Sequence, residues 1–159
     1  MKKIFCLLAV AVGFAGCLKN DEPEETCVPR EVTTVAAASE ISALKGFLSG
    51  NGISATEDPR GFFYTIVNPG TGGKPGYCSE VTVKYEGKLL DGTTFDSNNS
   101  FTYPLRNLIL GWQEGIPLIA TGGKIILYLP PSLGYGANAN GSIPANSNLI
   151  FTVDLLSFR

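Results

Sequence analysis

The chain has 159 residues, a formal net charge of −2 and 16% charged residues, which fits one globular domain with short accessory segments. It contains no histidine, so mechanisms that need an imidazole are excluded. A slightly acidic balance without a basic block argues against a nucleic-acid partner.

The first 16 residues predict an export signal. Two lysines supply a positive start, and the apolar stretch 4–12 is too short to span a bilayer as a helix. The small pair Ala15-Gly16 directly before Cys17 resembles the bacterial lipobox, in which the cysteine is lipidated and becomes the new N-terminus. A lipid at Cys17 would anchor an exported protein to the bacterial cell envelope, at the outer membrane, facing the periplasm or the surface. Ordinary secretory cleavage at a neighbouring bond is the alternative.

The remaining cysteines are consistent with export. Cys6 leaves with the signal and Cys17 would carry the lipid, which leaves Cys27 and Cys78. In an oxidising compartment these two can form a disulfide. Its loop of about 50 residues would stabilise the fold by about 4 kcal/mol in the chain-entropy model. Two separate thiols are the alternative, and the sequence does not decide between them.

Residues 17–34 predict an acidic, flexible tether, and residues 35–57 predict a helical extension. Within the extension, Ser39 is expected to cap a helix and Gly50-Asn51-Gly52 to end it. The apolar residues lie on one helical stripe: Ile41, Leu44, Phe47 and Leu48. This amphipathic helix would pack on the domain or on a second copy of the chain, where it would form the contact of a homodimer.

Residues 58–159 predict the main domain, which begins with strands. Residues 62–67 form a β-rich run that ends at the turn signal Asn68-Pro69-Gly70. Alternation of apolar and polar residues over 81–86 predicts a half-buried strand, and Asp91-Gly92 predicts a hairpin turn after it.

The second half of the domain contains a short helix and two further strands. Residues 108–116 are the only plausible second helix. Residues 124–129 are apolar at nearly every position, so they predict a central strand buried on both faces, and Pro130-Pro131 ends it. Residues 149–156 alternate again and predict a final strand.

Glycines and aromatic residues recur together in four segments of the domain. These segments are VKYEGKLLDGTTFDS, GWQEGI, LPPSLGYG and IPANSNLIFTVDLL. In order and spacing they resemble the successive signatures of the FKBP family of peptidyl-prolyl cis–trans isomerases, over roughly residues 62–159. The resemblance implies an α+β fold, in which an antiparallel sheet of five or six strands wraps around one short helix. It also implies an isomerase that assists the folding of exported proteins, with proline-containing polypeptides as partners and no cofactor or metal.

The resemblance carries a set of site residues onto this chain. Tyr135 and the backbone N–H of Ile109 would donate hydrogen bonds to a substrate carbonyl, and Trp112 would form the floor of the pocket. The implied catalytic residues are Tyr135, Asp96, Phe95 and Ile109. The implied substrate-binding residues are Tyr85, Phe101, Leu108, Trp112, Ile143 and Phe151.

Ser142 before Ile143 departs from the family pattern, where an apolar residue is more common, and two further departures lie next to the pocket residues. Residues 97–100 predict a short loop between Asp96 and Phe101, without an arginine to pair with Asp96. Arg106 directly precedes the pocket stretch, where it is expected to narrow the rim or to select acidic substrates. A second function therefore stays open, a non-catalytic FKBP-fold binding or chaperone module on a surface lipoprotein. The absence of histidine argues against a protease or esterase, because Ser97, Ser100 and Ser132 have no imidazole to activate them.

Overall fold

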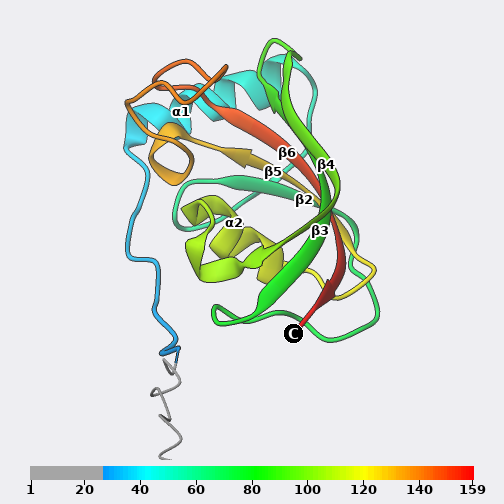
Figure 1. Cartoon of the computed structure of the whole chain (residues 1–159). Coiled ribbons are helices and arrows are strands. Elements are labelled where there is room, and N and C mark those ends of the chain that lie inside the picture. Colours follow the sequence, from blue (N-terminus) through cyan, green and yellow to red (C-terminus); the bar gives the residue numbers. More distant parts are fainter. Residues whose placement is uncertain (1–26) are drawn as a thin grey trace, which may run out of the picture.

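The computed structural model describes residues 27–159 (Figure 1). The predicted signal peptide, the predicted lipidation site Cys17 and residues 17–26 of the predicted tether lie outside the described residues. Within residues 27–159, no helix is both long and apolar enough to cross a membrane.

One antiparallel sheet of six strands forms the body of the domain, in the order β1-β2-β5-β6-β3-β4. The strands are β1 (Thr56–Glu57), β2 (Phe63–Asn68), β3 (Glu80–Leu89), β4 (Thr94–Pro104), β5 (Lys124–Leu129) and β6 (Leu149–Phe158). The predicted α+β fold with a sheet of five or six strands is confirmed. Strand β1 was not predicted, because two exposed residues show no periodicity.

Strand β5 occupies the centre of the sheet, as its apolar sequence predicted. Ile125 and Leu127 are fully buried in the main core, whereas Tyr128 is buried in a second cluster on the opposite face. The alternation predicted for the final strand is also confirmed. Inward-facing residues of β6 are fully or almost fully buried: Leu149, Phe151, Val153 and Leu155.

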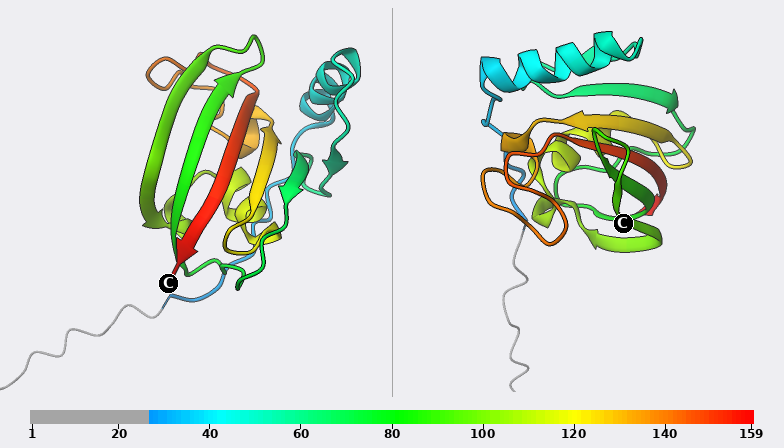
Figure 2. Two further views of the ribbon diagram at one scale, coloured as in Figure 1. Left: turned by 90° about the vertical axis from the view of Figure 1, so that its right-hand side faces the viewer. Right: turned by 90° about the horizontal axis from the view of Figure 1, so that it is seen from above.

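Two helices lie on opposite faces of the sheet (Figure 2). The short α2 (Leu110–Gly115) lies inside the curve of the sheet, between the 3-10 turns η1 (Leu105–Asn107) and η2 (Ile116–Leu118). A Cβ at Gly111 would lie 2.4 Å from the side chain of Leu129, and one at Gly115 would lie 2.5 Å from that of Leu127. Two glycines therefore let the backbone of α2 approach β5 closely.

The longer helix α1 (Ala38–Gly50) packs on the outer face of the sheet. Its Leu44 and Leu48 are buried against Phe63 of β2 and Tyr128 of β5. The apolar stripe of the helix is thus used within the chain, the first of the two predicted outcomes.

The two ends of α1 differ in how well the sequence predicted them. The predicted stop is confirmed, since the helix ends at Gly50 and Asn51 Nδ2 donates a 2.8 Å hydrogen bond to the carbonyl of Phe47. The predicted Ser39 cap is wrong. Ala37 is the N-cap and makes no side-chain capping bond. The backbone N–H of Ala36, just before the N-cap, donates a 2.8 Å hydrogen bond to the carbonyl of Arg60 and ties this end of α1 to the segment before β2.

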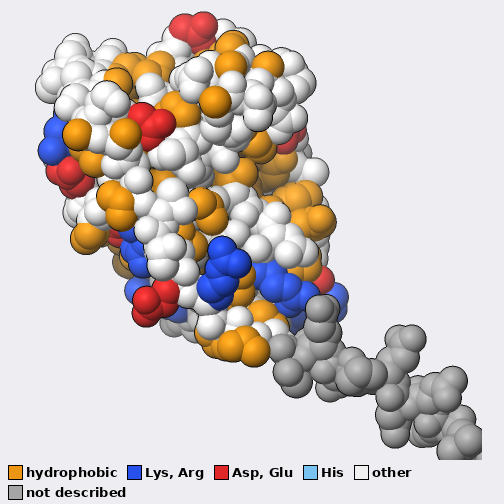
Figure 3. Space-filling model, turned by 90° about the vertical axis from the view of Figure 1, so that its left-hand side faces the viewer, with side chains coloured by type: hydrophobic (Ala, Val, Ile, Leu, Met, Phe, Trp, Pro, Cys, Tyr) orange, Lys and Arg blue, Asp and Glu red, His pale blue; other side chains and the backbone are white. Residues whose placement is uncertain are grey.

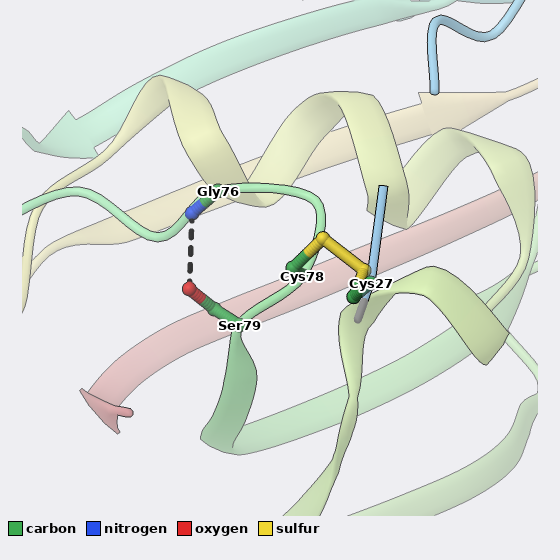
Figure 4. The surroundings of a disulfide bond; sticks show 4 residues. All are labelled: Cys27, Gly76, Cys78 and Ser79. Atoms are coloured by element: carbon green, nitrogen blue, oxygen red, sulfur yellow. Dashed lines mark hydrogen bonds between the residues drawn. A yellow bond between two sulfur atoms is a disulfide. The ribbon is translucent and has the colours of Figure 1, made fainter. Parts of the chain in front are cut away.

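Residues 27–37, here called the strap, run along the domain before α1. A disulfide between Cys27 and Cys78 fastens the beginning of the strap to the turn before β3 (Figure 4). Arg60 fastens its middle, because Arg60 Nε donates a 3.2 Å hydrogen bond to the carbonyl of Val32. Arg60 also forms an ion pair with Glu114 of α2 (3.0 Å), so the strap and α2 are tied to one side chain.

The loop predicted over 97–100 is wrong, because β4 runs through these residues without a break. Val83 pairs with Phe101 whereas Tyr85 pairs with Asn98, so the strand takes up one extra residue as a β-bulge. The bulge is closed locally, since Asn98 Oδ1 accepts a 2.8 Å hydrogen bond from the N–H of Ser100. Pairing with β3 therefore overrides the low strand propensity of an Asn/Ser run.

Candidate active site

A cleft of about 310 Å³ opens between the inner face of the sheet and the segment that leads into α2. Eight of the ten predicted site residues line it: Tyr85, Asp96, Phe101, Leu108, Ile109, Trp112, Tyr135 and Phe151. Asn107 lines it too, and only its position before Leu108 could have indicated this from the sequence.

Three residues singled out in the sequence lie elsewhere. The ring of Phe95 packs edge-on against that of Phe151, with centroids 5.5 Å apart, and so supports a wall of the cleft. Ile143 is buried in the main core. Arg106, which was expected at the rim, lines a second cavity instead.

Perpendicular aromatic contacts hold the floor and walls of the cleft together. Trp112 is 4% exposed, and its ring lies 5.1 Å from the rings of both Tyr85 and Phe151, at interplanar angles of 80° and 85°. Phe101 adds a further edge contact to Tyr85, at 5.8 Å. Edge-to-face pairs of this kind stabilise ring orientation beyond simple burial. The cleft is therefore a preformed apolar surface.

Two phenols bring hydroxyl groups to this surface. The Tyr85 hydroxyl donates a 2.5 Å hydrogen bond to Asp96 Oδ2. Burial is the largest cause that raises the pKa of Tyr85 well above its usual range, and this hydrogen bond and the charge of Asp96 raise it further. The pKa of Tyr135 is raised too, mainly by burial and to a smaller extent by the charge of Asp96. Both phenols are thus protonated at neutral pH, and Tyr135, 38% exposed, is available as a donor to a ligand.

A backbone N–H supplies a further donor. Ile109 is the N-cap of α2, and its carbonyl accepts hydrogen bonds from the N–H groups of Trp112 (2.9 Å) and Gln113 (3.2 Å). Its own N–H has no acceptor among residues 27–159. Gln113 Nε2 donates to the carbonyls of Leu108 (2.7 Å) and Arg106 (3.1 Å), which fixes the segment. The Ile109 N–H is therefore both unpaired and rigidly placed at the cleft.

The described part of the chain holds no group of three or more His, Cys, Asp or Glu side chains arranged to bind a metal. What the cleft offers is a rigid apolar surface, one carboxylate and two hydrogen-bond donors. Such a site suits an extended, apolar peptide segment whose carbonyl groups need partners.

Comparison with known proteins identifies the family. Residues 72–156, which include β3 to β5, α2 and most of β6, match the model described as FKBP-type peptidyl-prolyl cis-trans isomerase. The chain belongs to this family. Its sequence-based assignment to the FKBP family is confirmed.

Individual FKBP-type proteins resemble the chain over most of its length. FkpA of Buchnera aphidicola subsp. Schizaphis graminum is 44% identical over 121 residues, covering 73% of this chain and 47% of FkpA. Outer membrane protein MIP of Legionella longbeachae is 39% identical over 106 residues, covering 64% and 46% respectively. The chain thus spans about half the length of these relatives. A crystal structure of a peptidyl-prolyl cis-trans isomerase from Pseudomonas syringae superposes with a TM-score of 0.67 and 30% identity, covering 80% of this chain and 98% of that one.

Proposed function

We propose that this chain catalyses cis–trans isomerisation of X–Pro bonds in exported polypeptides. One observation carries the proposal: an FKBP-type domain holds an apolar cleft with Trp112 as its floor and Tyr85, Phe101 and Phe151 as its walls. This arrangement fits a prolyl ring and the bond before it.

The apolar character of the cleft explains how it would catalyse the rotation. Rotation about an X–Pro bond breaks amide conjugation and meets a barrier of about 18–20 kcal/mol. The twisted amide is less polar than the planar one and loses less by leaving water. An apolar cleft therefore binds the twisted state more tightly than the planar state, and this difference in binding lowers the barrier.

The polar groups of the cleft would bind and orient the peptide. We assign the Tyr135 hydroxyl and the Ile109 N–H as donors to substrate carbonyls near the proline. Asp96, held by Tyr85, places a negative charge in the cleft. A planar amide carries more negative charge on its oxygen than a twisted one, so this carboxylate disfavours the planar state. Phe95 positions the ring of Phe151 from behind the lining, and Ile143 belongs to the same core cluster as Trp112 and Phe151.

The proposed setting is the bacterial cell envelope. Among the relatives, MIP is named an outer membrane protein. The Cys27–Cys78 disulfide supports an oxidising compartment. Export with lipidation at Cys17 would tether the domain to a membrane. A homodimer through α1 stays a prediction, and the buried Leu44 and Leu48 already pack on their own sheet.

Proline-limited refolding of an unrelated small protein tests the proposal and separates it from a non-catalytic binding module. A catalyst speeds the slow refolding phase when present at one molecule per hundred of substrate. A binding module needs stoichiometric amounts and slows refolding or leaves it unchanged. Acceleration only at stoichiometric amounts would therefore reject the enzyme.

A further inference from the structure

A second, polar cavity of about 160 Å³ lies between the strap and the segment 106–113. Its polar side chains are Arg30, Thr33 and Thr34 from the strap, and Tyr77, Arg106 and Gln113 from the domain. Among residues 27–159, no Asp or Glu lines it. The cavity thus combines two positive charges with several hydrogen-bond donors.

The two arginines of this cavity lack the ion pairs that the other described arginines make. Arg60 pairs with Asp58 and Glu114, and Arg159 pairs with Glu80. Within residues 27–159, neither Arg30 nor Arg106 has a carboxylate within 4.0 Å. Unneutralised guanidinium groups at one cavity attract an anion, and their planar donor geometry matches a carboxylate or a phosphate. On this side of the molecule, Lys and Arg side chains gather near the beginning of the described chain (Figure 3).

The cavity and the cleft share a wall. Asn107, Leu108 and Ile109 line the cleft, whereas the residues on either side, Arg106 and Leu110, line the cavity. Consecutive Cα atoms are about 3.8 Å apart, so the two sites are separated by the thickness of one chain segment. The two hydrogen bonds from the Gln113 side chain to the carbonyls of Arg106 and Leu108 hold this wall in place.

Half of the cavity comes from outside the matched family domain. That match begins at residue 72, whereas the strap residues of the cavity lie at 30–34. The Cys27–Cys78 disulfide fixes the strap next to Tyr77, and Arg60 fixes it further along. The cavity is therefore a property of the strap added to the domain.

We propose that this cavity binds a carboxylate of the substrate polypeptide, from an Asp or Glu a few residues away from the proline that occupies the cleft. The proposal rests on the proposed function and adds a substrate class to it. A polypeptide is favoured over an anionic lipid headgroup, because the shared wall lets one extended chain reach both sites. The chain would thus prefer acidic X–Pro segments over neutral ones.

Paired peptides test the preference. Acetylated and amidated X–Pro peptides carry one Glu, or Gln in its place, at each position from two to five residues before or after the proline. NMR exchange on the full-length chain in detergent gives kcat/KM, and fluorescence of Trp112, the single tryptophan, gives Kd. At the best position, Glu is expected to raise kcat/KM and lower Kd about fivefold relative to Gln, and 0.5 M salt is expected to shrink this ratio.

Two arginine variants and one control variant test whether the preference for Glu peptides arises at this cavity. Arg106→Gln and Arg30→Gln are each expected to bring the Glu-to-Gln ratio toward one. Lys84→Gln removes the same charge from an exposed site on the outer face of β3, and it is expected to leave the ratio as in the wild type. The proposal is supported if the preference for Glu over Gln peptides disappears in both arginine variants and persists in Lys84→Gln.

Other outcomes overturn it. A ratio of one at every position in the wild type, or an equal loss with Lys84→Gln, would reject the site. Binding to anionic but not neutral vesicles that Arg106→Gln abolishes, with an unchanged peptide ratio, would assign the cavity to lipid headgroups. If no peptide is isomerised, the Kd ratio still decides, so failure of the proposed function and failure of this cavity remain distinguishable.

Discussion

The hydroxyl of Tyr85 donates a 2.5 Å hydrogen bond to Oδ2 of Asp96, which joins the neighbouring strands β3 and β4 at the cleft. The bond fixes Asp96, the one carboxylate that lines the cleft within the described part of the chain. It also orients the Tyr85 ring that contacts Trp112. One interaction thus couples the charge of the site to its apolar floor.

Tyr85→Phe removes this bond and keeps the ring. We expect the free energy of unfolding to fall by about 1 kcal/mol. We expect kcat/KM to fall about threefold to tenfold, because Asp96 is no longer held. Urea unfolding and NMR exchange measure the two effects. Tyr103→Phe removes a hydroxyl from a ring outside the cleft lining and should change neither quantity. Equal effects of the two variants would contradict the role of the bond.

Gly111→Ala and Gly115→Ala test the close packing of α2 on β5. Alanine normally stabilises a helix relative to glycine by about 1 kcal/mol. Here the added Cβ would approach Leu129 and Leu127 to 2.4 and 2.5 Å, so we expect a loss of about 1–3 kcal/mol and lower activity as Trp112 moves. Gly46→Ala in α1 meets nothing within 4 Å and is expected to stabilise. Stabilisation by all three changes would contradict the packing.

Removal of the Cys27–Cys78 disulfide tests the contribution of the strap. The bond joins residues 51 positions apart, and the chain-entropy model gives it about 4 kcal/mol. Cys27→Ser/Cys78→Ser should therefore lower Tm by on the order of 10 °C. Reductant should lower the Tm of the wild type and leave that of the double variant unchanged. A wild type insensitive to reductant would show that the bond contributes nothing to stability.

The two phenols of the cleft determine how kcat/KM and the free energy of unfolding are expected to depend on pH. Burial raises the pKa of Tyr85 and of Tyr135 above the ordinary value near 10, and the chain has no histidine. Both tyrosines therefore keep their protons from pH 6 to 9, and kcat/KM should be constant there. Above pH 10 the unfolded chain loses these protons first, so the free energy of unfolding should fall as pH rises. Tyr85→Phe should reduce this alkaline loss, as urea midpoints at pH 7 and 11 will show. A bell-shaped profile centred near neutrality would contradict this assignment.

The sequence predicted those elements in which local pattern and tertiary role agree. Strand β6 alternates along its length, and β5 is apolar because both of its faces are covered. Most of the cleft lining was also predicted, through its resemblance to family motifs. Composition alone would have placed residues such as Phe151 and Tyr85 in the core.

Features that depend on distant pairing were not predictable. The Asn/Ser run 97–100 is strand only because β3 pairs with it. The polar cavity requires residues 30–34 to lie beside 106–113, and no local pattern encodes that contact. Even the disulfide stayed open in the sequence, since two cysteines 51 residues apart reveal nothing about their distance in space.

Cis–trans exchange of short X–Pro peptides, measured by NMR with the full-length chain, tests the central claim most directly. We expect the folded chain to accelerate exchange. Tyr135→Ala is expected to lower kcat/KM about tenfold through loss of a substrate hydrogen bond. Leu156→Ala, a change at a similarly exposed side chain on the outer face of β6, should have no effect. Folded protein that leaves exchange unchanged across varied peptides would contradict the isomerase.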